Sequence, residues 1–292
     1  TTKTIRKIMR IKPMLAHKFD SNRICFETQE VHIQPKLDGI RCVFTKDGAY
    51  SRANNQFMNL EHLELKLELF FKNNPEAILD GELYNHQLKN DFEKIVSLVR
   101  KQKPTQKDRT DAQTMIQYHI YDMIPAKPSM NKVYLERYKT LSKEFKKKKY
   151  DRVIELVKTY SVKDYEQAVT YQKSFLKKGY EGAILRKNGL YKQKRAWELQ
   201  KMKDFHDTEA TIVGYEIGKG KRKGTLGKFL MQDDEGVEFG CPPGKGYTYK
   251  DLKDILDNID EYIGQRATFT YFQRTKAGSY RHPGFKGLRN YE

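Results

Sequence analysis

The chain has few cysteines and lacks the segments that direct proteins into or across membranes. Its three cysteines, Cys25, Cys42 and Cys241, are widely spaced, which fits neither a zinc site nor a disulfide framework. No apolar run approaches the roughly 20 residues of a membrane span. Residues 1–10 are basic but lack the apolar core of a signal peptide. We therefore expect a protein of the reducing cytoplasm, in a bacterium or a virus-infected host cell, that is not secreted.

Acidic residues are too few to balance the basic ones. Asp and Glu number 38 against 56 Lys and Arg, so the net charge is +18. This excess favours a polyanionic partner such as nucleic acid. The alternative partner, an anionic membrane, lacks support because no amphipathic anchor or lipidation motif occurs. With 292 residues, 38% of them hydrophobic, the chain can form one large domain or two smaller ones.

The chain also lacks a P-loop, since its glycine-rich segments at 218–220 and 240–246 fail the required spacing. It does contain Lys36 at a strand-to-turn boundary, with Asp38 and Arg41 at short offsets. A lysine amine becomes a nucleophile only when burial or neighbouring positive charge lowers its pKa from about 10.4. The alternative interpretation is a β-hairpin with an Asp38-Gly39 turn between solvated charges.

Alternation and turn residues predict a mixed first region up to about residue 204. Residues 60–70 fit a helix, although alternating leucines also fit a strand. A capping box at 90–93 predicts the start of a helix, residues 100–111 read as a polar loop, and residues 129–149 as a helix. Ser161 is expected to cap a helix that stops near Gly179. The predicted strands are Val31–Lys36, Ile40–Phe44, Ala77–Tyr84, Met115–Met123 and Glu181–Lys187.

The character of the sequence changes near Phe205. Short strands separated by glycine-rich turns follow, and one short helix opened by Thr248 interrupts them. This pattern predicts a small β-barrel of the OB type, with a domain boundary at residues 204–207. The predicted strands are Glu209–Glu216, Lys228–Gln232, Gly236–Gly240 and Arg266–Gln273.

Five further short motifs follow Lys36 in order along the chain. In the last of them, Lys201 and Lys203 flank Met202, which predicts one strand face bearing two ammonium groups that would bind phosphate. The alternative is an exposed strand edge that lysines protect from pairing. The five motifs are Ser51-Arg52, Asp80-Gly81-Glu82, Tyr118–Asp122, Glu181–Lys187 and Leu199–Lys203.

This ordered series resembles the covalent nucleotidyltransferase superfamily, and most closely its ATP-dependent DNA ligases of minimal, viral or phage-like form. The resemblance extends from Lys12 to Arg289. It implies an α+β fold in which a nucleotidyltransferase (adenylation) domain of antiparallel sheets with flanking helices, residues 1–204, precedes an OB-fold domain, residues 205–292. That division agrees with the boundary predicted from the strand pattern.

The resemblance also implies roles for individual residues. Lys36 corresponds to the nucleophile that attacks the α-phosphate of ATP and carries AMP, and Asp38 lies near the reacting oxygens. Glu181, with Glu82, would bind Mg²⁺, for which Mn²⁺ could substitute. The other nucleotide contacts would be Gln34 at the adenine edge, Arg41 and Arg52 on phosphate, Glu82 on the ribose, Tyr121 stacked on adenine, Arg195, Lys201 and Lys203 near the α-phosphate, and Arg289 at the leaving pyrophosphate.

Charge explains how such a site would work. One unit charge about 4 Å away contributes about 4 kcal/mol at an effective dielectric constant of 20. Lys201, Lys203 and the metal would therefore lower the pKa of Lys36 without deep burial. For DNA, we expect contacts from Arg52 and from a basic loop whose alternative interpretation is a solvated turn. The candidate residues of that loop are Lys219, Lys221, Arg222 and Lys223.

The sequence as a whole predicts a monomeric ATP-dependent DNA ligase that seals 5′-phosphate/3′-hydroxyl nicks in duplex DNA. One departure concerns Arg289, which precedes Asn-Tyr-Glu instead of the family's Asp and Lys. The first alternative is an RNA ligase or mRNA guanylyltransferase of the same superfamily. The second is an inactive, OB-containing nucleic-acid-binding protein.

Overall fold

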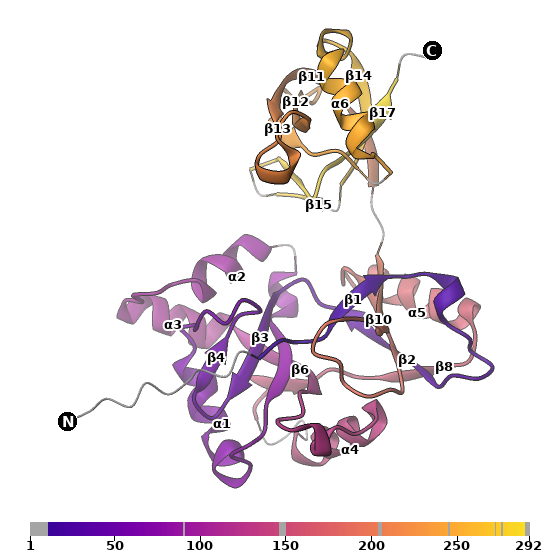
Figure 1. Ribbon diagram of the computed structural model, residues 1–292. Helices are drawn as coiled ribbons and strands as arrows, with labels where there is room; N and C mark the ends of the chain where they lie inside the picture. The colour runs from indigo at the N-terminus through magenta and orange to yellow at the C-terminus, as the bar shows by residue number, and fades with distance from the viewer. Residues whose placement is uncertain are drawn as a thin grey trace. The chain divides into compact units, whose positions relative to one another are not determined.

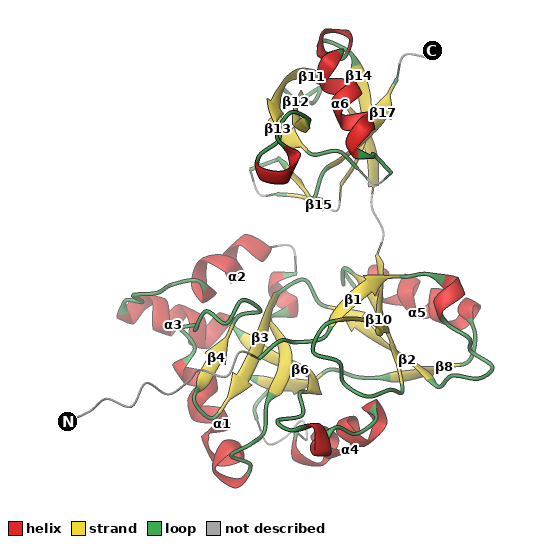
Figure 2. Cartoon of the chain, viewed as in Figure 1, coloured by secondary structure: helices red, strands yellow, loops and turns green. Residues whose placement is uncertain are grey.

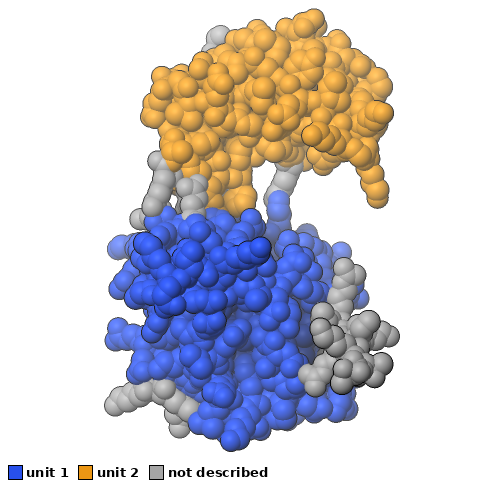
Figure 3. All heavy atoms as spheres, turned by 90° about the vertical axis from the view of Figure 1, so that its left-hand side faces the viewer, with its two compact units in different colours: residues 1–203 blue, residues 204–292 orange. Residues whose placement is uncertain are grey.

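The computed structural model describes residues 11–89, 91–145, 150–203, 206–244, 246–271, 273–275 and 277–289 (Figure 1). The chain divides into two compact units, residues 1–203 and 204–292, which Figure 3 colours separately. Among the described residues, none of the helices combines the length and apolar character that a bilayer span requires. We describe each unit by itself.

The first sheet of unit 1 contains the strand that ends at Lys36. Its strand order is β1 (Leu15–Lys18), β10 (Arg195–Lys203), β9 (Gly182–Lys187), β2 (Val31–Lys36) and β8 (Tyr160–Val162). β1 runs parallel to β10, and the other neighbours are antiparallel. Helix α5 (Tyr165–Lys177) covers one face, where Ala168 and Phe175 pack against Ile33 and Leu185. This packing fixes the direction in which β2 and β10 present their other side chains.

The second sheet of unit 1 is covered by most of the helices (Figure 2). Its strand order is β4 (Gly48–Tyr50), β3 (Ile40–Thr45), β5 (Leu79–Tyr84), β6 (Gln117–Met123) and β7 (Ile154–Leu156). Phe44, Leu79 and Ile120 on one face form a core with side chains of the helices. Those helices are α1 (Glu61–Asn73), α2 (Phe92–Val99), α3 (Gln106–Met115) and α4 (Tyr134–Glu144).

Unit 2 is a five-stranded antiparallel sheet with one helix. Its order is β13 (Glu238–Cys241), β12 (Leu226–Gln232), β11 (His206–Ile217), β14 (Arg266–Tyr271) and β17 (Gly284–Leu288), beside a ribbon of β15 (Gln273–Arg274) and β16 (Tyr280–Arg281). The backbone of Gly244 donates to Phe285 at 2.8 Å, which links the chain after β13 to β17 at the opposite edge. Helix α6 (Tyr249–Asp257) begins at a capping box of Thr248 and Asp251.

Short 3-10 turns complete the description. They are Ser21–Arg23, His86–Leu88, Pro128–Met130, Gly220–Arg222 and Ile259–Glu261. Turns of this kind occur mainly as connectors and at helix ends.

Most strands predicted from the sequence are confirmed, but one loop prediction and two helix predictions need correction. The predicted polar loop at 100–111 is wrong in its second half, because Thr105 and Asp108 form a capping box that starts α3. Asp164, not Ser161, caps α5, since Ser161 belongs to β8. The helix predicted over 129–149 begins at Tyr134, and residues 146–149 lie outside the described residues. Residues 60–70 are helical, which resolves that ambiguity.

Candidate active site

The side chains predicted to bind nucleotide line a cavity of about 240 Å³ in unit 1. Strands of both sheets contribute to it, because Lys36 ends β2 of the first sheet and Arg41, five residues further along the chain, belongs to β3 of the second. The cavity is lined by Leu15, Ala16, Gln34, Pro35, Lys36, Leu37, Arg41, Arg52, Glu82, Tyr121, Ile184, Arg186, Arg195, Leu199 and Lys201.

At one end of the cavity, the carboxylate of Glu181 lies between two lysines. One of its oxygens accepts from the ammonium group of Lys36 and the other from that of Lys203. The backbone N–H of Glu181 also donates to the carbonyl of Lys36 at 3.0 Å. Burial opposes the charge on Glu181, but Lys36 and Lys203 outweigh it and lower the pKa of this carboxyl. The group of cations predicted around Lys36 therefore includes an anion.

A glycine makes this arrangement possible. Gly182 pairs with Lys36 across β9 and β2, and with Lys203 across β9 and β10. Its φ is +148°, and a Cβ there would lie 2.1 Å from the carbonyl oxygen of Met202. A side chain would therefore push β9 away from β10 and separate Glu181 from the lysines.

Lys201 lies close to the same charges. Burial lowers the pKa of its ammonium group, and the nearby Lys36, Lys203 and Arg195 lower it further. Met202 is buried in the core beneath the sheet, so Lys201 and Lys203 do share one face of β10, as the alternation predicted. A patch of this kind attracts phosphate.

The opposite wall comes from the second sheet. The guanidinium of Arg41 donates two hydrogen bonds of 2.7 Å to Asp80, and a third of 3.0 Å to the carbonyl of Met14. The hydroxyl of Tyr121 donates to Glu82 at 3.1 Å. Burial raises the pKa of Glu82 to about 7, although Arg41 and Lys36 oppose that shift. Arg41 is thus held in place by a buried carboxylate, with its guanidinium 5.0 Å from the centre of the Tyr121 ring.

Gln34 lies at the base of the cavity with its amide fixed. Its amide nitrogen donates to the hydroxyls of Tyr134 (3.0 Å) and Thr159 (2.8 Å). Its amide oxygen accepts from Nε of Arg186 at 2.7 Å. Arg186 is itself paired with Asp122 at 2.8 Å. Because a guanidinium can only donate, it determines which end of the amide is the oxygen.

The remaining predicted residues are more dispersed. Arg52, in the turn after β4, and Arg195, at the start of β10, are exposed residues on the cavity lining, and Arg195 donates to the carbonyl of Ala16. Asp38 is not among the lining residues. Burial raises the pKa of Tyr84, and the charges of Tyr180 and Asp38 raise it further.

Several predicted residues belong to unit 2. The backbone N–H of Arg289 donates to Arg266 at 2.8 Å, and its guanidinium pairs with Glu209. The basic loop between β11 and β12 is exposed from Lys219 to Gly224, and a 3-10 turn, Gly220–Arg222, shapes it. The exposed side chains are Lys219, Lys221, Arg222 and Lys223.

Sequence reasoning missed the buried charges that support the cavity. Asp80 and Asp122 are 1% and 0% exposed, and Arg137 donates to both oxygens of Asp122. Asp80, Asp122 and Arg186 occur inside motifs that the sequence analysis singled out, but no role was given to them. A charged residue within an otherwise apolar strand was the available sign, because a buried charge requires a partner.

The side chains of this site could supply some, but not all, of the ligands of a hard divalent cation. Among the described residues, no group of three or more His, Cys, Asp or Glu side chains could hold a metal ion. Glu181 and Glu82 are close enough to affect each other electrostatically, and both offer oxygen ligands. Mg²⁺ keeps several waters and takes one or two protein carboxylates together with substrate phosphates. The two carboxylates fit that mode of binding.

Comparisons with known proteins agree with this geometry. Residues 13–203 match the family model of the ATP dependent DNA ligase domain, and residues 217–289 match the DNA ligase OB-like domain. A Lig E DNA ligase, from a study of DNA binding with a minimal scaffold, is 25% identical over 95% of this chain and 99% of its own, with a TM-score of 0.75. Comparison with curated protein sequences gave no match.

Two more distant structures share the fold. The protein Pmar-Lig_PreS3 is 24% identical over 96% of this chain and 68% of its own, with a TM-score of 0.77. The ATP-dependent DNA ligase of bacteriophage T7, solved in complex with ATP, is 18% identical over 95% and 98%, with a TM-score of 0.53. The predicted α+β fold with an adenylation domain and an OB-like domain is confirmed. The chain belongs to the ATP-dependent DNA ligase family.

Proposed function

We propose that this ligase seals 5′-phosphate/3′-hydroxyl nicks in duplex DNA as a monomer, through AMP bound to Lys36. The observation that carries the proposal is the position of Lys36 on the lining of the cavity of about 240 Å³, beside Lys201, Lys203 and Glu181. A primary amine surrounded by groups that bind phosphate is suited to attack phosphorus and poorly suited to a purely structural role.

The reaction takes place in three transfers. The amine of Lys36 attacks the α-phosphorus of ATP, a P–N bond forms, and pyrophosphate leaves as its P–O bond breaks. The AMP then passes to the 5′-phosphate of the nick, which frees Lys36. Finally the 3′-hydroxyl attacks that phosphate, loses its proton and displaces AMP, with Asp38 near the reacting oxygens.

Charge and position are the protein's main contributions to these steps. Lys201 and Lys203, beside Lys36, neutralise charge on the α-phosphate. Arg41 and Arg52 hold phosphate, and Arg195 lies at the rim. Glu181 and Glu82 would hold Mg²⁺ or Mn²⁺, which supplies charge neutralisation at the phosphates when bound. Arg41 is already oriented by Asp80, so substrate binding need not order it.

The base and sugar of ATP would occupy the rest of the cavity. Glu82 accepts from a ribose hydroxyl, Tyr121 stacks on the adenine, and Gln34 reads its edge. Unit 2 would supply Arg289 for the leaving pyrophosphate and Lys219, Lys221, Arg222 and Lys223 for the DNA backbone. A hinge at residues 204–207 would let unit 2 serve both steps. Residues 204 and 205 of that hinge lie outside the described residues.

The test follows transfer of label from ATP. With [α-³²P]ATP and Mg²⁺, wild type forms an acid-labile, alkali-stable protein–AMP adduct. We expect Lys36→Ala to lose at least about 10³-fold of this labelling, because no other amine occupies the attacking position. Lys46→Ala, a matched control in the turn between β3 and β4 and away from the cavity lining, should label like wild type. Equal labelling of Lys36→Ala and wild type contradicts the assignment of the nucleophile.

A second experiment separates this proposal from a related activity. Sealing of a singly nicked DNA duplex is compared with sealing of the corresponding RNA nick, and labelling by ATP with labelling by GTP. We expect DNA sealing with ATP. Preferential RNA sealing, or labelling by GTP, would instead indicate an RNA ligase or a guanylyltransferase.

A further inference from the structure

A second concavity adjoins the active-site cavity and shares two of its lining residues. It lies between β1 and β10 and has no role in the transfers described above. Arg195 and Lys201 line both hollows, so the two are neighbours. The concavity is lined by His17, Lys18, Phe19, Asp20, Arg195, Trp197 and Lys201.

The aromatic part of this surface is a stacked pair of rings. The rings of His17 and Trp197 are stacked at 3.8 Å between centroids, with 6° between their planes. The guanidinium carbon of Arg23 lies 5.0 Å from the centroid of the Trp197 ring. A β-bulge between Ala16 and His17 shifts the register of β1 against β10 at this point. The bulge therefore brings residues of the two strands into a stack instead of a regular ladder.

The charges of this surface favour an anion. Lys18, Arg23 and Arg195 are exposed and basic, and Lys201 is half-buried. The one acidic lining residue, Asp20, uses its carboxylate to accept the backbone N–H of Asn22 at 3.0 Å. Aromatic rings between basic side chains are typical of surfaces that bind nucleic-acid strands.

The position of this surface beside the cavity matters for the substrate. For sealing, a 5′-phosphate must enter the cavity and reach the AMP on Lys36. Successive phosphates of a strand follow at about 3.4 Å per nucleotide along the helix axis, so the next few must lie within about 10 Å of the cavity mouth. A concavity that shares Arg195 and Lys201 with the cavity falls within that distance.

We propose that the concavity between β1 and β10 binds the sugar–phosphate backbone of the DNA strand beside the nick. Lys18 and Arg23 contact its phosphates, and the stack of His17 and Trp197 holds Arg23 and the strand in position. This inference rests on the proposed function and identifies a DNA contact within unit 1. The competing occupant is pyrophosphate released from ATP, which the experiment distinguishes.

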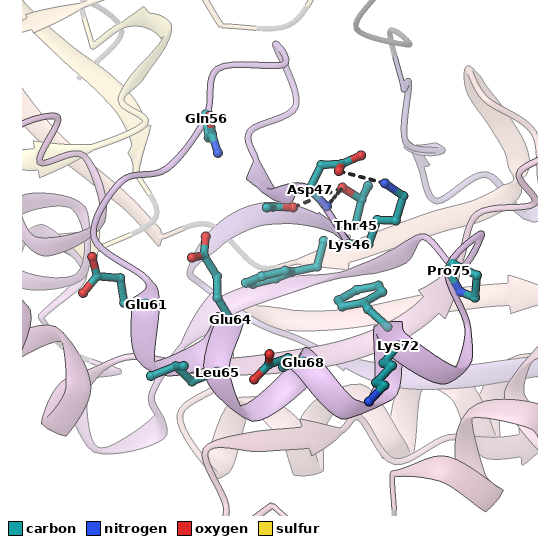
Figure 4. Close-up of a pocket in the computed structure, with 13 residues that line it drawn as sticks. Thr45, Lys46, Asp47, Gln56, Glu61, Glu64, Leu65, Glu68, Lys72 and Pro75 are labelled. Atoms are coloured by element: carbon teal, nitrogen blue, oxygen red, sulfur yellow. Dashed lines mark hydrogen bonds and ion pairs between the residues drawn. The ribbon is translucent and has the colours of Figure 1, made fainter. Parts of the chain in front are cut away.

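The first experiment measures DNA affinity in a charge-matched pair of variants. Lys18→Ala/Arg23→Ala removes two charges beside the cavity. Lys46→Ala/Lys72→Ala removes two from the separate pocket between α1 and the β3–β4 turn (Figure 4). Fluorescence anisotropy with a labelled nicked duplex, between 50 and 200 mM salt, reports affinity and its salt dependence. Self-adenylylation with ATP is measured for each protein.

The expected result is specific to the first pair. Lys18→Ala/Arg23→Ala should weaken nick binding by about tenfold and reduce the salt slope by about 1.8, since each phosphate contact contributes about 0.9. Its self-adenylylation and its inhibition by pyrophosphate should stay within about twofold of wild type. The Lys46→Ala/Lys72→Ala control should match wild type. Equal losses in both pairs, or no loss in either, would overturn the proposal.

A second experiment needs no variant. Trp197 is the single tryptophan of the chain, so intrinsic tryptophan emission reports on this surface alone. We expect a saturable change of emission with nicked duplex and none with pyrophosphate. A change with pyrophosphate alone assigns the concavity to the leaving group and refutes the DNA contact. Failure of wild type to form the AMP adduct would refute the proposed function separately.

Discussion

The two faces of the second sheet in unit 1 differ although the same strands form both. On one face, Arg41, Asp80, Glu82 and Tyr121 form a paired polar network at the cavity. On the other, residues one position away pack into an apolar core under α1, including Cys42, Phe44, Leu79 and Leu83. A shift of one residue in a strand exchanges its two faces. The register of these strands therefore decides which side chains face the cavity and which pack into the core.

The two hollows differ in charge as well as in size, and the larger one is not the one that suits ATP. The pocket between α1 and the β3–β4 turn has a volume of about 840 Å³, against about 240 Å³ for the active-site cavity. Figure 4 shows Glu61, Glu64, Glu68 and Asp47 around the larger pocket, with Leu65 beside them. Burial, followed by Glu61, raises the pKa of Glu64. The lining of this pocket has four carboxyl groups against two lysines, so its charge disfavours anions. The smaller hollow has the charges that ATP requires.

The largest effect that we expect comes from a substitution on the apolar face of the second sheet. Phe44→Ala should lower the free energy of unfolding by about 3–5 kcal/mol, because the side chain is 1% exposed and its loss leaves a cavity. Labelling by ATP per folded molecule should remain close to wild type. Urea unfolding gives the stability, and adduct formation is normalised to the folded fraction. A selective loss of labelling at unchanged stability would show that the two faces are not separable.

A smaller, pH-dependent effect comes from His119, which faces Glu82 across β5 and β6. Burial, aided by the charge of His86, lowers the pKa of His119 to about 4. In the unfolded chain the pKa of a histidine is about 6.5. Because the pKa of His119 is lower in the folded state, its neutral side chain contributes stability that is fully present above about pH 6.5 and is lost as the pH falls to about 4. Between pH 6.5 and 4, wild type should lose up to about 3 kcal/mol more stability than His119→Gln. Parallel pH profiles of the two proteins would contradict this assignment.

The smallest effect concerns the choice of base. Arg186 uses one lone pair of the Gln34 amide oxygen, and the second can accept the 6-amino group of adenine. The 6-oxo group of inosine would face this oxygen unfavourably, at a cost of about 1–3 kcal/mol. Wild type should therefore prefer ATP to ITP in adduct formation by about tenfold or more, and Gln34→Met should lose most of that preference.

Purine riboside triphosphate, which has no 6-substituent, is the matched control for this measurement. It should be used about equally by wild type and Gln34→Met, because it neither donates to nor repels the amide. If Gln34→Met keeps the full preference for ATP over ITP, another group reads the base.

Short-range patterns in the sequence predicted much of the fold. Alternation identified β2, β3 and β6, because a half-buried strand repeats every two residues. The change of character near Phe205 placed the boundary within a few residues of the division between the two units. Helix α3 was missed because few of its residues are apolar, Ala112 being its one buried residue, so periodicity could not reveal it.

The candidate site was predicted as a set of residues but not as a geometry. Lys36, Lys201 and Glu181 were identified from ordered motifs, and no local pattern indicated that Glu181 bridges Lys36 and Lys203. The bridge depends on β9 pairing with both β2 and β10, which is a long-range register. The motif also predicted Asp38 near the reacting oxygens, and this role stays a prediction because Asp38 is not among the residues that line the cavity.

The order of the motifs, the excess of positive charge and the strand periodicities were properties of the chain itself, since each depends on residues close in sequence. Tertiary structure decided which charges are neutralised. Asp80 fixes Arg41, Asp122 fixes Arg186 and through it Gln34, and Glu181 joins two lysines, across separations of 22 to 152 residues. Electrostatic energy depends on distance in space and on burial, and both are set only when the strands have paired.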